Sequence, residues 1–268
     1  MPNSMIQLLK CIRYVNTVRS IWSPEADIMV ALVDRATASS TSGGAYAGWY
    51  TRVFSEAVGP EGQGHSFEPV PTTFSLLRYC TRRLSLRNVV LHNCAASSSR
   101  GTAVMTVPHY PGGGKNYHQV RGNESPERLR HLSVDLRTVD SELPRTPRPI
   151  TLIKGDVEGH RAALEGAAGT IERDRPALCV EVTGDPDAAG SSSHRIVSSL
   201  GRLGYEPYWL GACRLVRRRA GDRRKLLSPD RRSPDPARRS RSPGRLIAYL
   251  TGQPDISSLS WATMRRRS

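Results

Sequence analysis

Residues 150–159 constrain the fold of this 268-residue chain more than any other stretch. The stretch begins with an apolar run, 150–153, that Pro149 bounds upstream, and such a run predicts a buried strand. Three charged side chains follow around two glycines: Lys154, Asp156 and Glu158. The helix-prone segment 160–168 comes next. This order is typical of open α/β sheets, which bind ligands at the carboxyl ends of their strands. An ordinary turn with solvated charges is the alternative.

Two further acids lie at or after the ends of predicted apolar strands. Glu181 is near the end of the run 176–182, and Glu68 follows a strand that ends near Phe67. The glycine-rich turn 43–48 precedes Glu68 by about twenty residues, and glycines let backbone N–H groups approach a ligand closely. In a Rossmann-like unit, an acid at this spacing accepts hydrogen bonds from ribose hydroxyls. A surface glutamate before a proline turn is the competing interpretation.

Hydrophobic spacing and turn residues predict the other elements. The expected helices are 5–22, 49–58, 71–84 and 194–203. The expected strands are 28–33, 88–92, 102–107, 132–136, 207–210, 213–216 and 246–250, the segments 207–210 and 213–216 forming a hairpin. Segment 35–42 has small polar residues and is expected to form a loop.

The motifs between residues 44 and 182 resemble, in order, those of the FkbM family of S-adenosylmethionine-dependent methyltransferases. The matching pieces are 44–51, 67–69, 93–97, 139–140, 153–159 and 175–181. The resemblance implies an α/β fold of the Rossmann-like class I methyltransferase type, with a mostly parallel sheet and helices on both faces. It also implies S-adenosyl-L-methionine as cofactor, and places segment 111–130 near the substrate opening.

The resemblance and the spacing together give a set of cofactor-binding candidates. These are Gly44, Ala45, Tyr46, Gly48, Glu68, Pro69, Asn93 and Ala95. Glu68 is expected to bind the ribose, because a carboxylate offers two acceptor oxygens. Small residues after Asn93 leave room for a flat adenine ring, although tight packing explains them equally well.

Methyl transfer to an alcohol requires a base near the hydroxyl group, because an alcohol is a poor nucleophile. Asp156 is the first candidate for this base and Glu158 the second. Lys154 is expected to hold a carboxylate or contact the substrate, and His160 is a further candidate base or a solvent-facing first-turn histidine. Acidic side chains here could bind a hard cation, but no His pair or thiolate cluster supports a transition metal, so we predict no metal.

The chain departs from the family pattern at three positions. Ser42 stands where the family has an acid, Tyr46 where it has an asparagine, and Gly155 where it has an apolar residue. Ser42 cannot supply the charge that anchors the amino-acid end of the cofactor. Asp34 could replace it if the first strand is 28–33.

The net charge of +15 is concentrated towards the carboxyl terminus. Residues 214–245 contain thirteen Lys and Arg against three Asp, and 265–267 add three Arg. We therefore expect four regions: an N-terminal helix and edge segment at 1–41, a methyltransferase core at 42–216, a disordered Arg/Ser/Pro-rich insertion at 217–244, and a last strand with a basic tail at 245–268.

Five cysteines without a CxxC motif indicate reduced, buried thiols in a cytoplasmic protein. No apolar run approaches the length of a membrane span. The sequence thus predicts O-methylation of a hydroxyl on a sugar, glycolipid or polyketide-like small molecule. A degenerate family member with weak or no cofactor binding is the first alternative. Nucleic-acid binding through the basic tail is the second and is disfavoured, because that tail lacks interleaved aromatics. The oligomeric state stays open.

Overall fold

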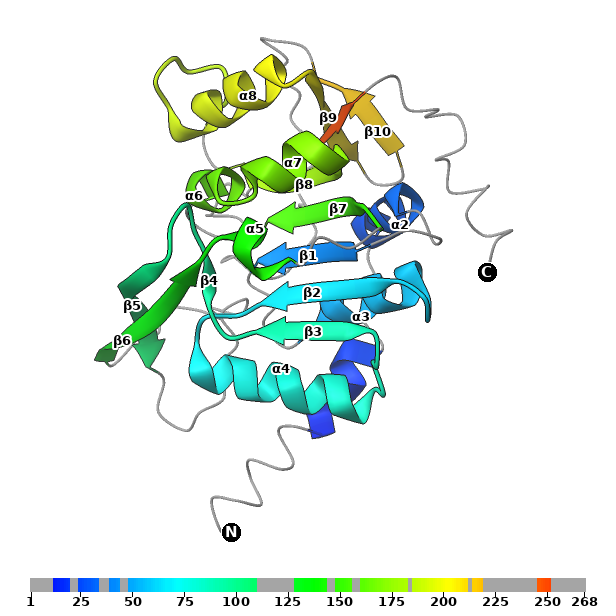
Figure 1. Cartoon of the computed structure of the whole chain (residues 1–268), viewed down its shortest axis with the longest axis vertical. Coiled ribbons are helices and arrows are strands. Elements are labelled where there is room, and N and C mark those ends of the chain that lie inside the picture. Colours follow the sequence, from blue (N-terminus) through cyan, green and yellow to red (C-terminus); the bar gives the residue numbers. More distant parts are fainter. Residues whose placement is uncertain are drawn as a thin grey trace, which may run out of the picture.

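The computed structural model describes residues 12–19, 24–33, 39–43, 48–109, 128–143, 148–155, 160–182, 185–211, 214–218 and 245–251. Its centre is an eight-stranded sheet with strand order β10-β9-β11-β8-β7-β1-β2-β3. Helices lie on both faces of this sheet (Figure 1). The arrangement confirms the predicted Rossmann-like α/β fold with a mostly parallel sheet.

Five neighbouring strands of the sheet run parallel. They are β1 (Ser39–Gly43), β2 (Gln63–Phe67), β3 (Val89–His92), β7 (Ile150–Gly155) and β8 (Ala177–Val182). The other three are β9 (Tyr205–Gly211), β10 (Arg214–Arg217) and β11 (Arg245–Thr251). β11 lies between β8 and β9 and is antiparallel to both, and β10 forms the predicted hairpin with β9.

The helices cover both faces of the main sheet. In chain order, α2 (Pro24–Leu32), α3 (Trp49–Val58) and α4 (Pro71–Arg83) precede β3. α5 (Val139–Glu142), α6 (His160–Glu165), α7 (Ala168–Asp174) and α8 (Ser192–Arg202) follow it, and residues 12–19 are also helical. The α2 and α3 side chains share one core cluster with Leu152 and Cys179. The α7 and α8 side chains share another with Ile153 and Leu178. Neighbouring residues of one strand thus face opposite layers, as the period of two in a strand requires.

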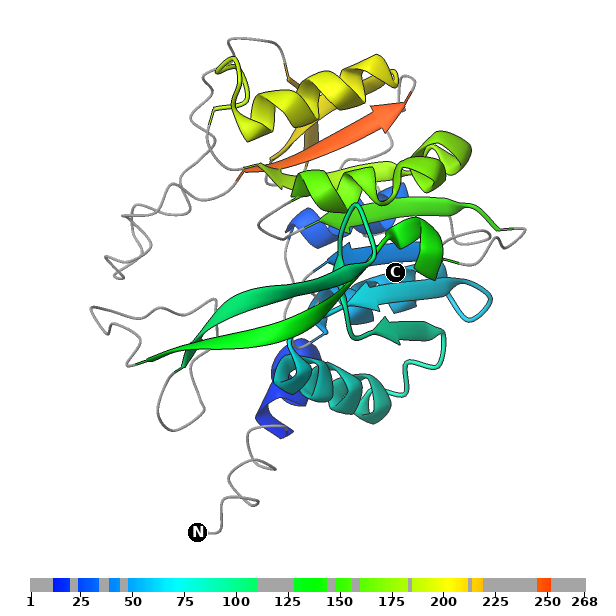
Figure 2. The ribbon, with the colours of Figure 1, turned by 60° about the vertical axis from the view of Figure 1, so that its left-hand side comes forward.

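A small second sheet stands beside the first, with strand order β4-β6-β5. Its strands are β4 (Ala95–Ala96), β5 (Gly101–His109) and β6 (Arg128–Arg137). β5 and β6 form an antiparallel ribbon that projects from the end of the main sheet where the parallel strands finish (Figures 1 and 2). The carboxyl edge of the main sheet therefore lies at the base of this ribbon.

Two predictions at the start of the chain are wrong. Segment 28–33 is not a strand, because it belongs largely to α2, where Ile28 and Met29 are fully buried. A short apolar run does not distinguish a buried helix from a buried strand, and Pro24 at the first helical position favours the helix. Segment 39–43 is not part of a loop. It forms the central strand β1, held by backbone pairing to both β2 and β7.

The predicted helix 160–168 is interrupted at Gly166. A Cβ atom there would lie 1.9 Å from the carbonyl oxygen of Ser97, so the chain passes this point only as glycine. The helix therefore divides into α6 and α7. Among the described residues, no helix is long and apolar enough to cross a bilayer. The predicted insertion at 217–244 lies almost entirely outside the described residues, and the four-region division stays a prediction.

Candidate functional site

The glycine-rich turn leads from β1 into α3. Gly48 caps α3 with φ of 95°, a left-handed conformation that favours glycine. A Cβ atom at this position would lie 2.9 Å from Leu77 Cδ1 of α4, so the turn packs too closely for a side chain. Gly44, Ala45 and Tyr46 lie outside the described residues. Their contacts with a cofactor stay predictions.

Glu68 lies directly after β2, at the carboxyl edge of the sheet. Its side chain is 5% exposed, and its Oε1 accepts a hydrogen bond from the Val70 N–H at 3.0 Å. This bond closes a turn around Pro69 and fixes the carboxylate before α4 begins. The structure therefore holds an acid where the sequence predicts the ribose-binding carboxylate.

Asn93 joins the ends of β2 and β3. Its side-chain amide donates to the carbonyl oxygen of Glu68 at 2.8 Å and to that of Pro69 at 3.3 Å. Ala95 follows in β4, where it pairs with Leu136 of β6. Glu68, Pro69 and Asn93 are thus brought together, while Ala95 begins the second sheet. An adenine contact by Asn93 or Ala95 stays a prediction.

Lys154 is buried at 2% exposure in β7, although its charge would normally favour solvent. Its Nζ lies 4.3 Å from the centroid of the Tyr50 ring in the first turn of α3. It pairs in register with Cys179 of β8 and Ser42 of β1. Lys154 therefore points to the α3 side of the sheet, beneath the start of that helix. A contact with substrate is untested.

The other predicted catalytic side chains are not described. Asp156 and Glu158 lie between β7 and α6, outside the described residues. His160 begins α6, but its side chain is also outside them. These three stay candidates by their position after β7. In the described part of the chain, no group of three or more His, Cys, Asp or Glu side chains could hold a metal ion.

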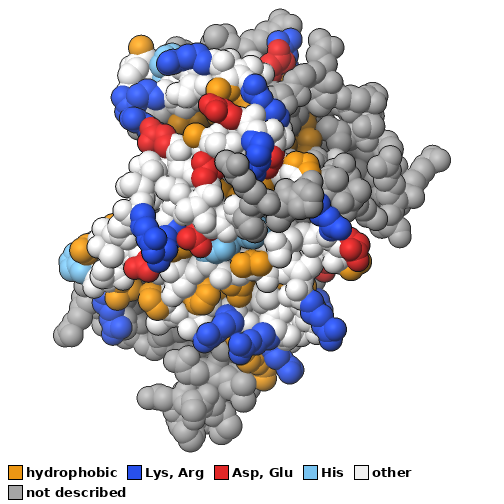
Figure 3. All heavy atoms as spheres, in the orientation of Figure 1, with side chains coloured by type: hydrophobic (Ala, Val, Ile, Leu, Met, Phe, Trp, Pro, Cys, Tyr) orange, Lys and Arg blue, Asp and Glu red, His pale blue; other side chains and the backbone are white. Residues whose placement is uncertain are grey.

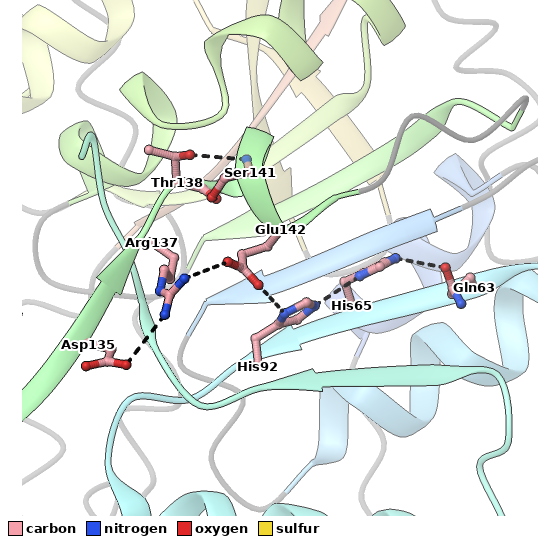
Figure 4. Close-up of polar contacts among 8 residues, drawn as sticks. All are labelled: Gln63, His65, His92, Asp135, Arg137, Thr138, Ser141 and Glu142. Atoms are coloured by element: carbon pink, nitrogen blue, oxygen red, sulfur yellow. Dashed lines mark hydrogen bonds and ion pairs between the residues drawn. The ribbon is translucent and has the colours of Figure 1, made fainter. Parts of the chain in front are cut away.

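A chain of polar side chains that the sequence did not predict lies at this edge of the sheet (Figure 4). His65 Nδ1 is 3.1 Å from His92 Nε2, and His92 Nδ1 is 3.2 Å from Glu142 Oε2. At one end, His65 Nε2 is 3.1 Å from the Gln63 amide oxygen. At the other, Arg137 lies 3.8 Å from Glu142 and 3.8 Å from Asp135. This series of side-chain contacts connects β2, β3, α5 and β6.

Both histidines are neutral near pH 7. Burial, together with a smaller contribution from the nearby His92, lowers the pKa of His65 to about 4. Burial also lowers the pKa of His92, against an opposing hydrogen bond and charge from Glu142. A carboxylate only accepts, so His92 Nδ1 carries its proton towards Glu142, and His92 Nε2 accepts from His65 Nδ1–H. In this tautomer His65 Nε2 carries no proton, so a hydrogen bond to Gln63 requires the amide to be turned from the orientation in which its oxygen lies 3.1 Å away.

The sequence carries only one weak sign of these polar contacts, which is the position of both histidines near the ends of strands. His65 lies two residues before Phe67, on the same face of β2, and His92 is the last residue of β3. The Phe67 and His92 rings stack at 4.4 Å with an interplanar angle of 11°. In Figure 3, histidine atoms are visible near the centre of the face, beside acidic atoms.

Asp140, one of the family-like residues, has a structural role. Its carboxylate accepts from the Gly169 and Thr170 N–H groups, each at 2.8 Å, and from the Thr170 hydroxyl at 2.7 Å. These are the first amides of α7, which otherwise lack partners inside the helix. Asp140 thus holds α5 against the start of α7.

The described cysteines are free and buried, as predicted: Cys80, Cys94 and Cys179. Burial raises the pKa of the Cys179 thiol to about 12 and that of Cys94 to about 11. Thiols with such pKa values stay protonated and do not act as nucleophiles.

The parallel sheet, Gly48 at the start of α3 and the acid after β2 define a Rossmann-like domain of the class I methyltransferase type. The family model described as "Methyltransferase FkbM domain" matches residues 42–207, more than half of the chain. The chain therefore belongs to the FkbM methyltransferase family, as the sequence motifs predict. A comparison with curated proteins gave no match.

Several solved structures are similar to this one. Methyltransferase FkbM from Methylobacillus flagellatus KT is 15% identical, with a TM-score of 0.48, and the match covers 80% of this chain but only 44% of that protein. Rv0187 from MTB, solved with cofactor bound, is 12% identical over 91% of this chain and 88% of its own, with a TM-score of 0.49. The O-methyltransferase TomG from Streptomyces achromogenes, solved with SAM, is 11% identical over 91% and 90%, with a TM-score of 0.48.

Proposed function

We propose that this chain is an S-adenosylmethionine-dependent methyltransferase that transfers a methyl group to a hydroxyl oxygen of a small molecule. Family membership supports methyl transfer. The preference for a hydroxyl, on a sugar, glycolipid or polyketide-like compound, follows from the resemblance of the motifs to the family. The observation that carries the proposal is the placement of Glu68, a buried carboxylate fixed by the Val70 N–H at the carboxyl edge of β2.

The described residues fit a nucleoside cofactor. Glu68 would accept hydrogen bonds from the ribose hydroxyls, because its carboxylate offers acceptors on both oxygens. Gly48 keeps the start of α3 free of a side chain, so backbone amides can approach the ligand. Asn93 ties the end of β3 to Glu68 and would border the adenine. These three residues would form one side of the cofactor site.

The cofactor supplies a methyl group that is electrophilic because it is bound to a positive sulfur. The protein must orient the acceptor hydroxyl and remove its proton. Asp156 is our first candidate for the base, with Glu158 and His160 as alternatives, since all three follow β7 at the carboxyl edge of the sheet. Lys154 lies beneath Tyr50, so we expect it to shape the start of α3 as well as the substrate site.

A family member with weak cofactor binding is the second candidate. β1 ends at Gly43, so Ser42 stands near the carboxyl end of the first strand, where the family has an acid. Without a carboxylate at this position, the protein would bind the ammonium group of the cofactor less tightly. Nucleic-acid binding by the basic region has less support, because residues 217–244 contain no aromatic side chains between their basic ones. A cytoplasmic location is also a proposal.

Calorimetric titration of the full chain with S-adenosylmethionine and S-adenosylhomocysteine tests cofactor binding directly. Transfer from methyl-labelled S-adenosylmethionine should then be followed with two matched sets of acceptors, one bearing hydroxyl groups and one bearing amines in their place. We expect saturable binding and label only in the hydroxyl set. Weak or absent binding of both compounds would favour the degenerate alternative, and transfer to amines alone would contradict O-methylation.

A further inference from the structure

The ends of β2 and β3 are joined through the backbone of His92. The Glu68 N–H donates to the His92 carbonyl oxygen at 3.0 Å. One residue further, the Asn93 amide donates to the Glu68 carbonyl oxygen at 2.8 Å. His92 therefore bonds to Glu68 through its backbone and directly precedes Asn93 in the chain. A shift of His92 would move both residues.

The His92 ring is held on three sides. Phe67 stacks on it at 4.4 Å, His65 bonds its Nε2 at 3.1 Å, and Glu142 accepts from its Nδ1 at 3.2 Å. The His92 side chain is only 9% exposed, so water has little access to its ring, although Glu142 is 25% exposed. The ring consequently has one orientation, and Figure 4 shows it pointing from the end of β3 towards α5.

We propose that His92 is a positioning residue, which fixes the ends of β2 and β3 and thereby sets the affinity of the protein for its cofactor. This inference rests on the proposed function, because it assigns cofactor binding to Glu68 and Asn93. His92 itself does not touch the cofactor. It acts on Glu68 through its backbone carbonyl, and on Asn93 through the peptide bond that joins the two residues.

Glu142 extends the effect to the β5–β6 ribbon. It lies at the end of α5, and Arg137 near the end of β6 is 3.8 Å from its other oxygen. α5 is in turn fixed to α7 by Asp140. Loss of Glu142 would release the His92 ring from α5 without touching Glu68, so this residue gives a separate way to test the positioning role.

Protonation would disturb this arrangement. The titratable and charged groups that face His92 are His65 from β2, Glu142 from α5, Asp135 and Arg137 from β6, and the neighbouring Cys94. A proton added to His92 Nε2 would oppose the N–H of His65 Nδ1, since two donors would then meet. His65 could accept only by moving its own proton to Nε2. We therefore expect the chain of hydrogen bonds to rearrange in acid.

The test compares binding of S-adenosylmethionine to four variants of the full chain by calorimetry between pH 5 and 8. His92→Phe keeps the stacking on Phe67 but loses both ring hydrogen bonds, and Glu142→Ala loses one of them. Glu142→Gln restores an acceptor without the charge. His131→Gln is the matched control, because His131 is an exposed histidine on β6 whose ring bonds only Thr106 among the contacts described.

We expect His92→Phe to weaken binding about tenfold at pH 7.5, Glu142→Ala to weaken it several-fold, and Glu142→Gln to restore it to within about twofold. Wild-type affinity should fall towards the acid end of this range, because burial lowers the pKa of His92, and His92→Phe should show a flat profile. His131→Gln should match the wild type throughout. A variant that is only less stable would have a lower melting temperature. Its cofactor affinity, measured on the folded protein, would keep the wild-type dependence on pH.

Two failures are distinguishable. If the wild type binds neither S-adenosylmethionine nor S-adenosylhomocysteine, the proposed function is wrong and the inference falls with it. If the wild type binds and both His92→Phe and Glu142→Ala bind equally well with the same pH profile, only the inference is wrong. Should His92→Phe not fold, the Glu142→Ala and Glu142→Gln pair decides, because unchanged affinity in both would overturn the positioning role.

Discussion

The ammonium group of Lys154 lies over the ring of Tyr50, 4.3 Å from its centroid, inside the protein. A desolvated cation–π contact of this kind contributes about 2 kcal/mol. We expect Tyr50→Leu to lower the free energy of unfolding by about that amount, because the buried ammonium loses a favourable neighbour. Urea unfolding measures the change, with Tyr79→Leu, a half-buried tyrosine of α4, as control.

The double variant Tyr50→Leu with Lys154→Met isolates this contact from the packing of the tyrosine. If the cation matters, the two substitutions together should cost clearly less than the sum of the single costs. Additive effects would show that Tyr50 stabilises the protein only through its apolar contacts, which include stacking on Phe54.

Glu68→Ala should weaken S-adenosylmethionine binding by about 1–3 kcal/mol, the cost of leaving ribose hydroxyls without an acceptor. Titration calorimetry on the folded variant gives the change. Glu172→Ala removes an exposed acid of α7 and should leave the affinity as it is. Equal affinity in the Glu68 variant and the wild type would remove the ribose assignment.

Ser42→Asp should tighten cofactor binding by about tenfold, since a charged hydrogen bond is worth roughly 1.5–3 kcal/mol and 1.4 kcal/mol is one decade. The position of β1 favours Ser42 over Asp34, because the first strand is Ser39–Gly43 and not segment 28–33. Asp34→Ala should accordingly change little. The opposite pattern, with binding lost in Asp34→Ala and unaffected in Ser42→Asp, would return the role to Asp34.

Acid should destabilise the protein through His65. Its pKa is about 4 in the folded state against about 6.5 when unfolded, so the unfolded chain binds the extra proton first. The stabilising contribution is fully present above pH 6.5 and is lost as the pH falls towards 4, by about 3 kcal/mol at most. Urea unfolding at several pH values should show a shallower acid loss in His65→Gln than in the wild type. Parallel curves for the two proteins would contradict the assignment.

Elements with clear boundaries were predictable from the sequence. The helix predicted at 49–58 is α3 itself, because Gly48 and Gly59 mark its two ends. The apolar strands before Asp156 and around Cys179 are β7 and β8. Strand β1 was not predictable, because its five residues are Ser, Thr and Gly, and its stability comes from backbone pairing on both sides.

The site was predictable only where it follows strand ends. Glu68 became a candidate through its spacing after the glycine-rich segment, and its role in binding stays a prediction. The contacts of His65 with His92 and of His92 with Glu142 join residues 27 and 50 positions apart, so no local pattern contains them. The role of Asp140 was equally hidden, since the helix that it caps begins 28 residues later, at Ala168.

The position of β11 has a consequence for synthesis of the chain. β8 and β9 do not pair with each other, because β11 lies between them and bonds to both. While the chain is being made, β8 therefore has an open edge until Arg245–Thr251 leaves the ribosome. We expect nascent chains stalled before this segment to expose two unpaired strand edges, which makes them targets for chaperones and proteases. Pairing of β11 thus covers both of these strand edges in one step.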